Sequence, residues 1–150
     1  MVTRTRFDDS ECPVARSVDA IGDWWSLLIV RDAFDGSRRF GEFQRSLGVA
    51  KNILATRLRT LVAGGVLETV PASDGSAYRE YVLTPKGKAL FPVIVALRQW
   101  GEQNFFAPGE PHSQLVDRRQ GRRLRPLEVM SADAQRLNPD DTIVHKVSTQ

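Results

Sequence analysis

The sequence predicts a mainly α domain with a small β-hairpin, followed by a short β-rich C-terminal extension. Three observations support this fold class. Apolar residues recur at helical spacing up to Ala63, two β-favouring runs joined by a polar segment follow, and the composition changes after residue 109. A chain of 150 residues has room for one domain of about 100 residues and such an appendage.

Four helices are expected in the first part of the chain. Each ends at a glycine or at an Asp-Gly pair, which stop helices or form turns. The expected helices run from Pro13 to near Gly22, from Trp24 to Phe34, from Phe40 to Leu47 and from Lys51 to Ala63. The two faces of the fourth helix differ: Leu54, Leu58, Leu61 and Val62 share one face, and Asn52, Thr56, Arg59 and Ala63 lie opposite.

A hairpin and a long helix are expected next. Residues 66–70 and 78–83 favour strands, and residues 71–77 form a polar tip. Thr84 and Pro85 resemble a helix start, and the helix is expected to reach Phe106. Its apolar residues cover more than one stripe, so we expect burial on two sides. A second copy of the chain, giving a homodimer, is favoured over a monomer whose tail folds across the helix.

Two regions of the chain are expected from its composition. Residues 1–109 form the domain with dimerisation helices at both ends, and residues 110–150 form the β-rich, partly flexible extension. Strand-like runs in the extension are 114–117, 127–130 and 142–147.

Positive charge is concentrated on the third and fourth helices. Between Arg38 and Arg59 there are six basic residues and a single acid, Glu42, although the whole chain has a formal charge of only +3. Such clustering favours a polyanionic partner. Short helices followed by a hairpin form a winged helix-turn-helix, in which one helix enters the major groove of double-stranded DNA. The sequence therefore predicts a DNA-binding protein.

The candidate DNA contacts follow from this arrangement. Asn52 can pair with adenine, Arg59 with guanine or phosphate, and Thr56 with a base or the backbone. Lys51, Arg38 and Arg39 are better placed for phosphate, and Arg79 beside the hairpin tip is a candidate for phosphate or the minor groove. Arg57 is a further candidate, although its aliphatic stem can instead cover the buried face. Any one of these residues can also be an ordinary surface side chain, so the cluster carries the argument.

Six groups of residues form a series of motifs along the chain. They are Cys12-Pro13-Val14 with Ile21-Gly22 and Trp25, Leu28 to Arg31, Arg39 to Phe43, Asn52 to Ala55 with Arg57-Leu58, Gly65 to Leu67, and Tyr81 to Gly87. In their order and spacing these motifs resemble the HxlR-type family of winged helix-turn-helix transcriptional regulators, relatives of the MarR-type regulators. The resemblance implies a symmetric dimer on a pseudopalindromic operator, with half-sites about 34 Å apart. Repression and activation both remain open, as do the operator, the target genes and the inducer.

Two kinds of signal that would control DNA binding are compatible with the sequence. The resemblance makes Cys12 a candidate redox sensor; with no second cysteine, only Cys12 pairing between subunits, a small-thiol adduct or alkylation is available, and an inert cysteine is the alternative. A small-molecule effector is the competing signal. Its candidate pocket residues are Trp24, Trp25, Phe34, Phe91 and Trp100, which can equally be core.

Other functions find little support. No catalytic motif is present, a thiolate zinc site needs more than one cysteine, and the two histidines have no metal-ligand spacing, so we expect no enzyme, metal or cofactor. No apolar run is long enough to span a membrane, and no signal peptide is recognisable, so a cytoplasmic protein is expected. A winged-helix module for protein association, without specific DNA binding, is the alternative function.

Overall fold

The computed structural model describes residues 6–147, so the outer ends of both predicted regions, 1–5 and 148–150, lie outside the described residues. The chain forms two compact units, Met1–Ile94 and Val95–Gln150. The boundary between them lies inside a helix, whereas the sequence predicted it after that helix, at residue 109.

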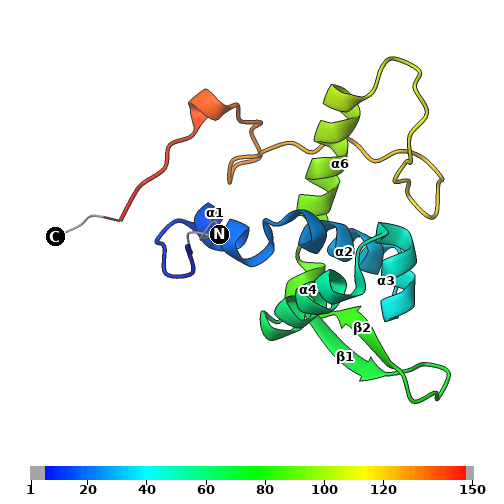
Figure 1. Cartoon of the computed structure of the whole chain (residues 1–150). Coiled ribbons are helices and arrows are strands. Elements are labelled where there is room, and N and C mark those ends of the chain that lie inside the picture. Colours follow the sequence, from blue (N-terminus) through cyan, green and yellow to red (C-terminus); the bar gives the residue numbers. More distant parts are fainter. Residues whose placement is uncertain (1–5, 148–150) are drawn as a thin grey trace. The chain divides into compact units, whose positions relative to one another are not determined.

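Four helices, a hairpin and the short helix α5 (Pro85–Lys88) lie in the first unit. The helices are α1 (Pro13–Ile21), α2 (Trp24–Phe34), α3 (Phe40–Leu47) and α4 (Lys51–Ala63), and the strands are β1 (Leu67–Pro71) and β2 (Arg79–Leu83). The strands pair antiparallel, with Leu67 opposite Leu83 and Pro71 opposite Arg79. Figure 1 shows the hairpin projecting from α2, α3 and α4 as an arm. This winged helix-turn-helix confirms the predicted fold class.

The core of this unit lies where α2, α3, α4 and β1 meet. Ile29, Phe43 and Leu58 are all fully buried there. Further buried members of the same cluster are Val30, Val49, Leu54, Leu61, Val66 and Leu67. Gly48 ends α3 with a φ of 63°, a left-handed conformation that glycine adopts without a Cβ penalty. The core and this turn together fix how α3 and α4 meet.

The helix expected over 85–106 is interrupted, which corrects the prediction of one continuous helix. It consists of α5 (Pro85–Lys88) and α6 (Phe91–Phe105), separated by Ala89 and Leu90. Pro92 explains the break, because proline has no N–H to donate to the carbonyl of Lys88 and its ring clashes there. In α6, Pro92 occupies the second position, where no intrahelical donor is needed.

The second unit contains most of α6 and the extension. The described part of the extension has two isolated antiparallel bridges, Val116 with Arg123 and Met130 with Arg136, and a short 3-10 helix, η1 (Pro139–Asp141). The expected β-rich character is therefore reduced to single bridges in residues 110–147. Few apolar side chains are buried here, and Leu127, Val129 and Ile143 are all exposed. Strands without a buried face have little to stabilise them.

Candidate nucleic-acid interface

The exposed face of α4 is produced by the burial of its opposite face. Leu54, Leu58 and Leu61 are buried in the core. Because these three positions repeat at helical spacing, Asn52, Thr56 and Arg59 are all left exposed on the other face, as predicted.

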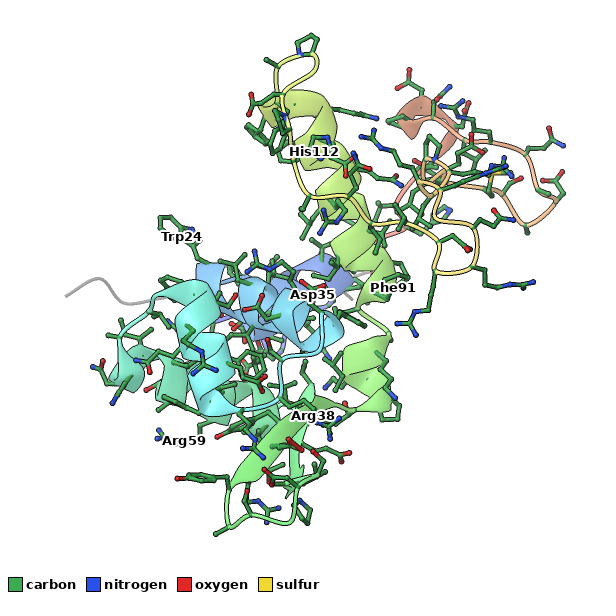
Figure 2. The ribbon with its side chains drawn as sticks, turned by 90° about the vertical axis from the view of Figure 1, so that its right-hand side faces the viewer. Trp24, Asp35, Arg38, Arg59, Phe91 and His112 are labelled. Atoms are coloured by element: carbon green, nitrogen blue, oxygen red, sulfur yellow. The ribbon has the colours of Figure 1, made fainter. Side chains whose placement is uncertain are left out.

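Polar groups on this face are available to a ligand. The Thr56 hydroxyl donates to the Asn52 carbonyl oxygen at 2.9 Å, so its oxygen can still accept a hydrogen bond. Within residues 6–147, the Asn52 amide and the Arg59 guanidinium have no hydrogen-bond or ion-pair partner. Figure 2 shows Arg59 pointing away from the fold. An amide and a guanidinium on one helix face match the donors and acceptors of base edges.

The N-terminus of α4 offers a second kind of contact. Ala50 precedes the helix and supplies no side-chain cap, so N–H groups of the first turn have no side-chain acceptor. Lys51 is exposed beside them. Free N–H groups, the positive end of the helix dipole and a lysine together suit a phosphate group.

Arg38 and Arg39, just before α3, form ion pairs with acids of the hairpin. Arg38 Nε lies 3.2 Å from Glu80 Oε1, and Arg39 Nε lies 3.6 Å from Glu80 Oε2. Arg39 Nη2 also lies 2.5 Å from Asp74 Oδ2. Part of each arginine remains exposed, with side-chain exposures of 46% and 35%. We call Arg38, Arg39, Asp74 and Glu80 the wing clamp.

Glu80 is the buried centre of the wing clamp, with only 3% of its surface exposed. It accepts hydrogen bonds from the Ser73 backbone N–H at 3.0 Å and the Ser73 hydroxyl at 3.3 Å. The Ser73 N–H holds the pKa of Glu80 below its ordinary value, and the nearby Arg38 acts in the same direction against burial. At Asp74, the Ser76 N–H and then Arg39 lower the pKa further still. Both carboxylates are therefore stabilised in the charged form.

Backbone contacts join the same two elements. The Tyr81 N–H donates to the Arg38 carbonyl oxygen at 2.7 Å. Glu42 Oε1 accepts from the backbone N–H groups of Arg38 at 3.1 Å and Arg39 at 2.9 Å, which caps α3 and lowers the pKa of Glu42. The hairpin is thus attached to the start of α3 through both main chain and side chains.

Arg57 faces a different part of the unit from Arg59. Its Nε lies 3.6 Å from Asp23 Oδ1 and is buried without a hydrogen-bond partner. Asp23 caps α2 by accepting from the backbone N–H groups of Trp25 and Ser26. Burial raises the pKa of Asp23, but the hydrogen bonds from Ser26 and the charge of Arg57 outweigh it and the net shift is downward. Arg57 therefore links α4 to the start of α2.

Arg79, on β2, is the remaining basic residue of the predicted set. Arg79 is exposed and donates across the hairpin to the Thr69 carbonyl oxygen at 3.1 Å and to its hydroxyl at 3.2 Å. Of the six basic residues between Arg38 and Arg59, those without an ion-pair partner in the described chain are Arg45, Lys51 and Arg59. The free positive charge on α3 and α4 is thus about half of what the sequence count indicates.

The five aromatic residues of the predicted pocket are divided among three places. Trp24, with 85% of its surface exposed, and Trp25 line a hollow of about 490 Å³ together with Val18, Asp23 and Arg57. Figure 2 shows Trp24 at the edge of its unit. The rings of Phe34 and Phe91 are in contact, with centroids 5.5 Å apart. Trp100 belongs to the second unit and packs on Phe105.

Cys12 is exposed at the position that precedes α1. Its backbone N–H donates to the Ser10 hydroxyl at 3.1 Å. An exposed thiol is accessible to an oxidant or to a second thiol, which is one requirement for a sensor.

The sequence reasoning missed three acids that form ion pairs with predicted DNA contacts. Asp23 pairs with Arg57, and Asp74 and Glu80 belong to the wing clamp. Their signal was weak, because acids in a turn or a strand are usually solvated. Glu80 does stand between Arg79 and Tyr81 in a β-favouring run, where an inward-facing charge requires a partner. Finding that partner needs the hairpin register and the position of α3, which a single sequence does not provide.

Neither a metal-binding cluster nor a membrane-spanning helix is found in the described part of the chain. Within residues 6–147, no group of three or more His, Cys, Asp or Glu side chains is placed to hold a metal ion. No helix in that part of the chain has the length and apolarity required to cross a bilayer.

Comparison with known proteins identifies the family. The model of the HxlR-like helix-turn-helix family matches residues 20–108. The chain belongs to this family. A relative in Mycobacterium tuberculosis, named an uncharacterized HTH-type transcriptional regulator, is 43% identical over 102 residues, which cover 68% of this chain. The same match spans 65% of that relative, which is just under two thirds of its length.

One solved structure extends the similarity to 95% of this HxlR-like chain. PA1607, provisionally described as a transcription factor, has a TM-score of 0.90 and 57% identity over 95% of this chain and 100% of its own. The redox regulator HypR in its reduced form has a TM-score of 0.57 and 32% identity, covering 62% of this chain and 93% of its own. These similarities place the protein in a family whose relatives are named helix-turn-helix transcriptional regulators.

Proposed function

We propose that this HxlR-like protein is a sequence-specific transcriptional regulator that binds a pseudopalindromic operator as a homodimer. The observation that carries the proposal is the exposed face of α4, where the side chains of Asn52, Thr56 and Arg59 have no side-chain partner among residues 6–147. Asn52 and Arg59 would read base edges in the major groove. Lys51 and the α4 N-terminus would bind phosphate, which sets the register without specifying sequence.

The wing clamp refines the roles of the other predicted contacts. Arg38 and Arg39 hold the hairpin through Glu80 and Asp74, and their exposed parts would supply long-range attraction to the DNA backbone. Arg57 would support α4 from the side of Asp23. Arg79 lies on the hairpin with its guanidinium donating to Thr69, so a phosphate contact would use its remaining donors.

Exposed apolar side chains support the homodimer. On α1, Val14 and Val18 have exposures of 69% and 50%. On α6, the exposed large apolar residues are Phe91, Val93, Leu97, Trp100 and Phe105. Apolar surface of this extent on a small chain marks an interaction site, and a two-fold interface uses the same surface of both copies. Such a dimer would present two α4 helices to two half-sites.

The signal is proposed to be either redox or a small molecule, with Cys12 as the redox candidate. Its exposure and its place before α1 support this role. The related protein HypR is described as a redox regulator. The hollow beside Trp24 and Trp25 is the candidate site for a small-molecule effector, because it combines indole surface with the charged groups of Asp23 and Arg57. A cytoplasmic location stays a prediction.

The first test is binding of the purified protein to DNA from its own upstream region, at about 0.15 M salt, where surface electrostatics are screened as in a cell. Wild type and Cys12→Ser would be compared with and without a mild thiol oxidant. Specific binding that oxidation abolishes only when Cys12 is present would support redox sensing. Specific binding unaffected by oxidant would exclude it. Failure to discriminate any operator from unrelated DNA, on a genome-wide selection of fragments, would favour the protein-association module.

A further inference from the structure

The extension carries a second basic region, distinct from α3 and α4. Five arginines occur between residues 118 and 125, a segment without an acidic residue. We call them the arginine cluster: Arg118, Arg119, Arg122, Arg123 and Arg125. All five are exposed. None of them forms an ion pair within residues 6–147, in contrast to Arg38, Arg39 and Arg57.

The backbone beneath the arginine cluster is held in a defined turn. Asp117 Oδ1 accepts from the backbone N–H groups of Arg119 and Gln120, both at 2.8 Å. The Gly121 N–H donates to the Asp117 carbonyl oxygen at 2.7 Å, and the Asp117 N–H donates to the Arg122 carbonyl oxygen at 2.8 Å. Arginines thereby flank both sides of one tight turn. Asp117 Oδ1 closes this turn, and within residues 6–147 the Asp117 carboxylate forms no ion pair with an arginine.

The turn is also attached to α6. Gln99 Nε2 donates to the Arg125 carbonyl oxygen at 3.1 Å, and Gln99 Oε1 accepts from the Leu127 N–H at 2.7 Å. Arg98 Nη1 donates to the hydroxyl and the carbonyl oxygen of Ser113 at 2.9 and 3.1 Å. These bonds hold the segments on both sides of the turn. The next acid along the chain, Glu128, pairs with Arg136 at 3.8 Å.

We propose that the arginine cluster binds the phosphate backbone of DNA flanking the operator half-site. Unpaired, exposed arginines on a fixed turn are suited to phosphate, because the guanidinium donates in a planar fork. DNA is favoured over an acidic protein because the cluster and α4 belong to the same chain, and a chain already bound to DNA through α4 raises the effective concentration of phosphate at the cluster. The proposal rests on the proposed operator binding.

The test compares the full-length protein with two variants. In R118Q/R119Q/R122Q/R123Q four charges are removed, and in R118K/R119K/R122K/R123K the same positions keep their charge. Both sets lie at exposed positions without ion-pair partners, so matching thermal melts are expected and would verify folding. Binding would be measured by fluorescence anisotropy on an operator duplex of minimal length and on duplexes lengthened at each end by about 5 or 10 base pairs, up to one helical turn.

On the lengthened duplexes, the glutamine variant is expected to bind about tenfold or more weakly than wild type near physiological salt, because several phosphate contacts are lost. Its dependence of log affinity on log salt should be shallower by about 0.9 for each lost contact. On the minimal duplex the two proteins should bind alike, and the lysine variant should follow wild type in the salt dependence throughout.

Two other outcomes overturn the proposal in distinguishable ways. If wild type discriminates the operator but the glutamine variant matches it in affinity and salt slope at every length, the cluster does not bind DNA, and an acidic protein surface becomes its partner. If the glutamine variant loses the same affinity on the minimal duplex as on the longer ones, the contact is not in flanking DNA. If the wild-type protein does not discriminate the operator from a scrambled duplex, the proposed function itself is contradicted.

Discussion

The winged unit and the extension carry basic side chains in two different ways. In the winged unit, Arg38, Arg39 and Arg57 are paired with acids, and Glu80 is buried to 3% exposure while doing so. In the extension, the arginine cluster is exposed and forms no ion pair with the described residues, on a turn closed by Asp117. A count of basic residues therefore does not measure the positive charge that is available to a ligand. In the winged unit part of that charge stabilises the fold.

The two regions also differ in how they are stabilised. Ile29, Phe43 and Leu58 belong to a continuous buried cluster in the winged unit. The second unit has Val95 buried among its described residues, and its extension is held largely by hydrogen bonds to Arg98 and Gln99. Apolar burial is the dominant stabilising term in folding, so the winged unit should account for most of the measured stability.

The largest expected effect tests this difference directly. Leu58→Ala removes a fully buried side chain and should lower the free energy of unfolding by about 2–5 kcal/mol through lost burial and a cavity. Leu127→Ala, at 51% exposure in the extension, is the matched control and should change it by about 0.5 kcal/mol or less. Chemical denaturation followed by circular dichroism measures both. Equal losses would contradict the assignment of the core.

A smaller effect is expected from the wing clamp. Glu80→Gln keeps the shape of the side chain but removes the charge that holds Arg38 and Arg39, so Tm should fall by a few degrees. Glu128→Gln serves as the control in the extension, because Glu128 and Arg136 are 3.8 Å apart with side-chain exposures of 37% and 70%, against 4% for Glu80. Differential scanning fluorimetry measures the Tm of both variants. A Glu80→Gln protein as stable as wild type would show that the clamp is dispensable.

Acidification should weaken the wing clamp in the same pH range as the Glu42 and Asp23 helix caps, whose pKa values are also depressed. The pKa values of Glu80 and Asp74 are depressed in the folded state, so their contribution is present above the ordinary carboxyl range and is lost as pH falls through the folded values. Wild-type Tm should therefore decline below about pH 4, where unfolded carboxylates bind protons. The Glu80→Gln variant should show a shallower decline, measured by melts across the acid range. Parallel declines would argue against the clamp as the titrating element.

Much of the winged unit could be predicted because its signals are local. The spacing of Leu54, Leu58 and Leu61 fixes which face of α4 is buried, and Gly48 marks the turn before it. The break before α6 was also a local signal, since Pro92 forbids a continuous helix, but the apolar run masked it. The clamp could not be predicted, because Arg38 and Glu80 meet only after the hairpin folds against the start of α3.

The extension was predicted less well for a physical reason. Runs such as 127–130 favour strands by composition, yet strands form when a partner and a buried face are available. Here Met130 forms one isolated bridge with Arg136, and the rest of the run, residues 127–129, is exposed. The predicted DNA contacts on α4 depend on its exposed face, which the structure confirms as exposed, while their binding to bases stays a prediction.

The most direct measurement of the central claim is a specificity profile of Asn52→Ala, Arg59→Ala and Arg39→Ala against a library of operator variants. If α4 reads bases, Asn52→Ala and Arg59→Ala should each relax preference at one position per half-site, by about 1–3 kcal/mol of discrimination. Arg39→Ala, which acts through the wing clamp and the backbone, should weaken binding to all sequences alike. Unchanged base preference in both α4 variants would contradict the account.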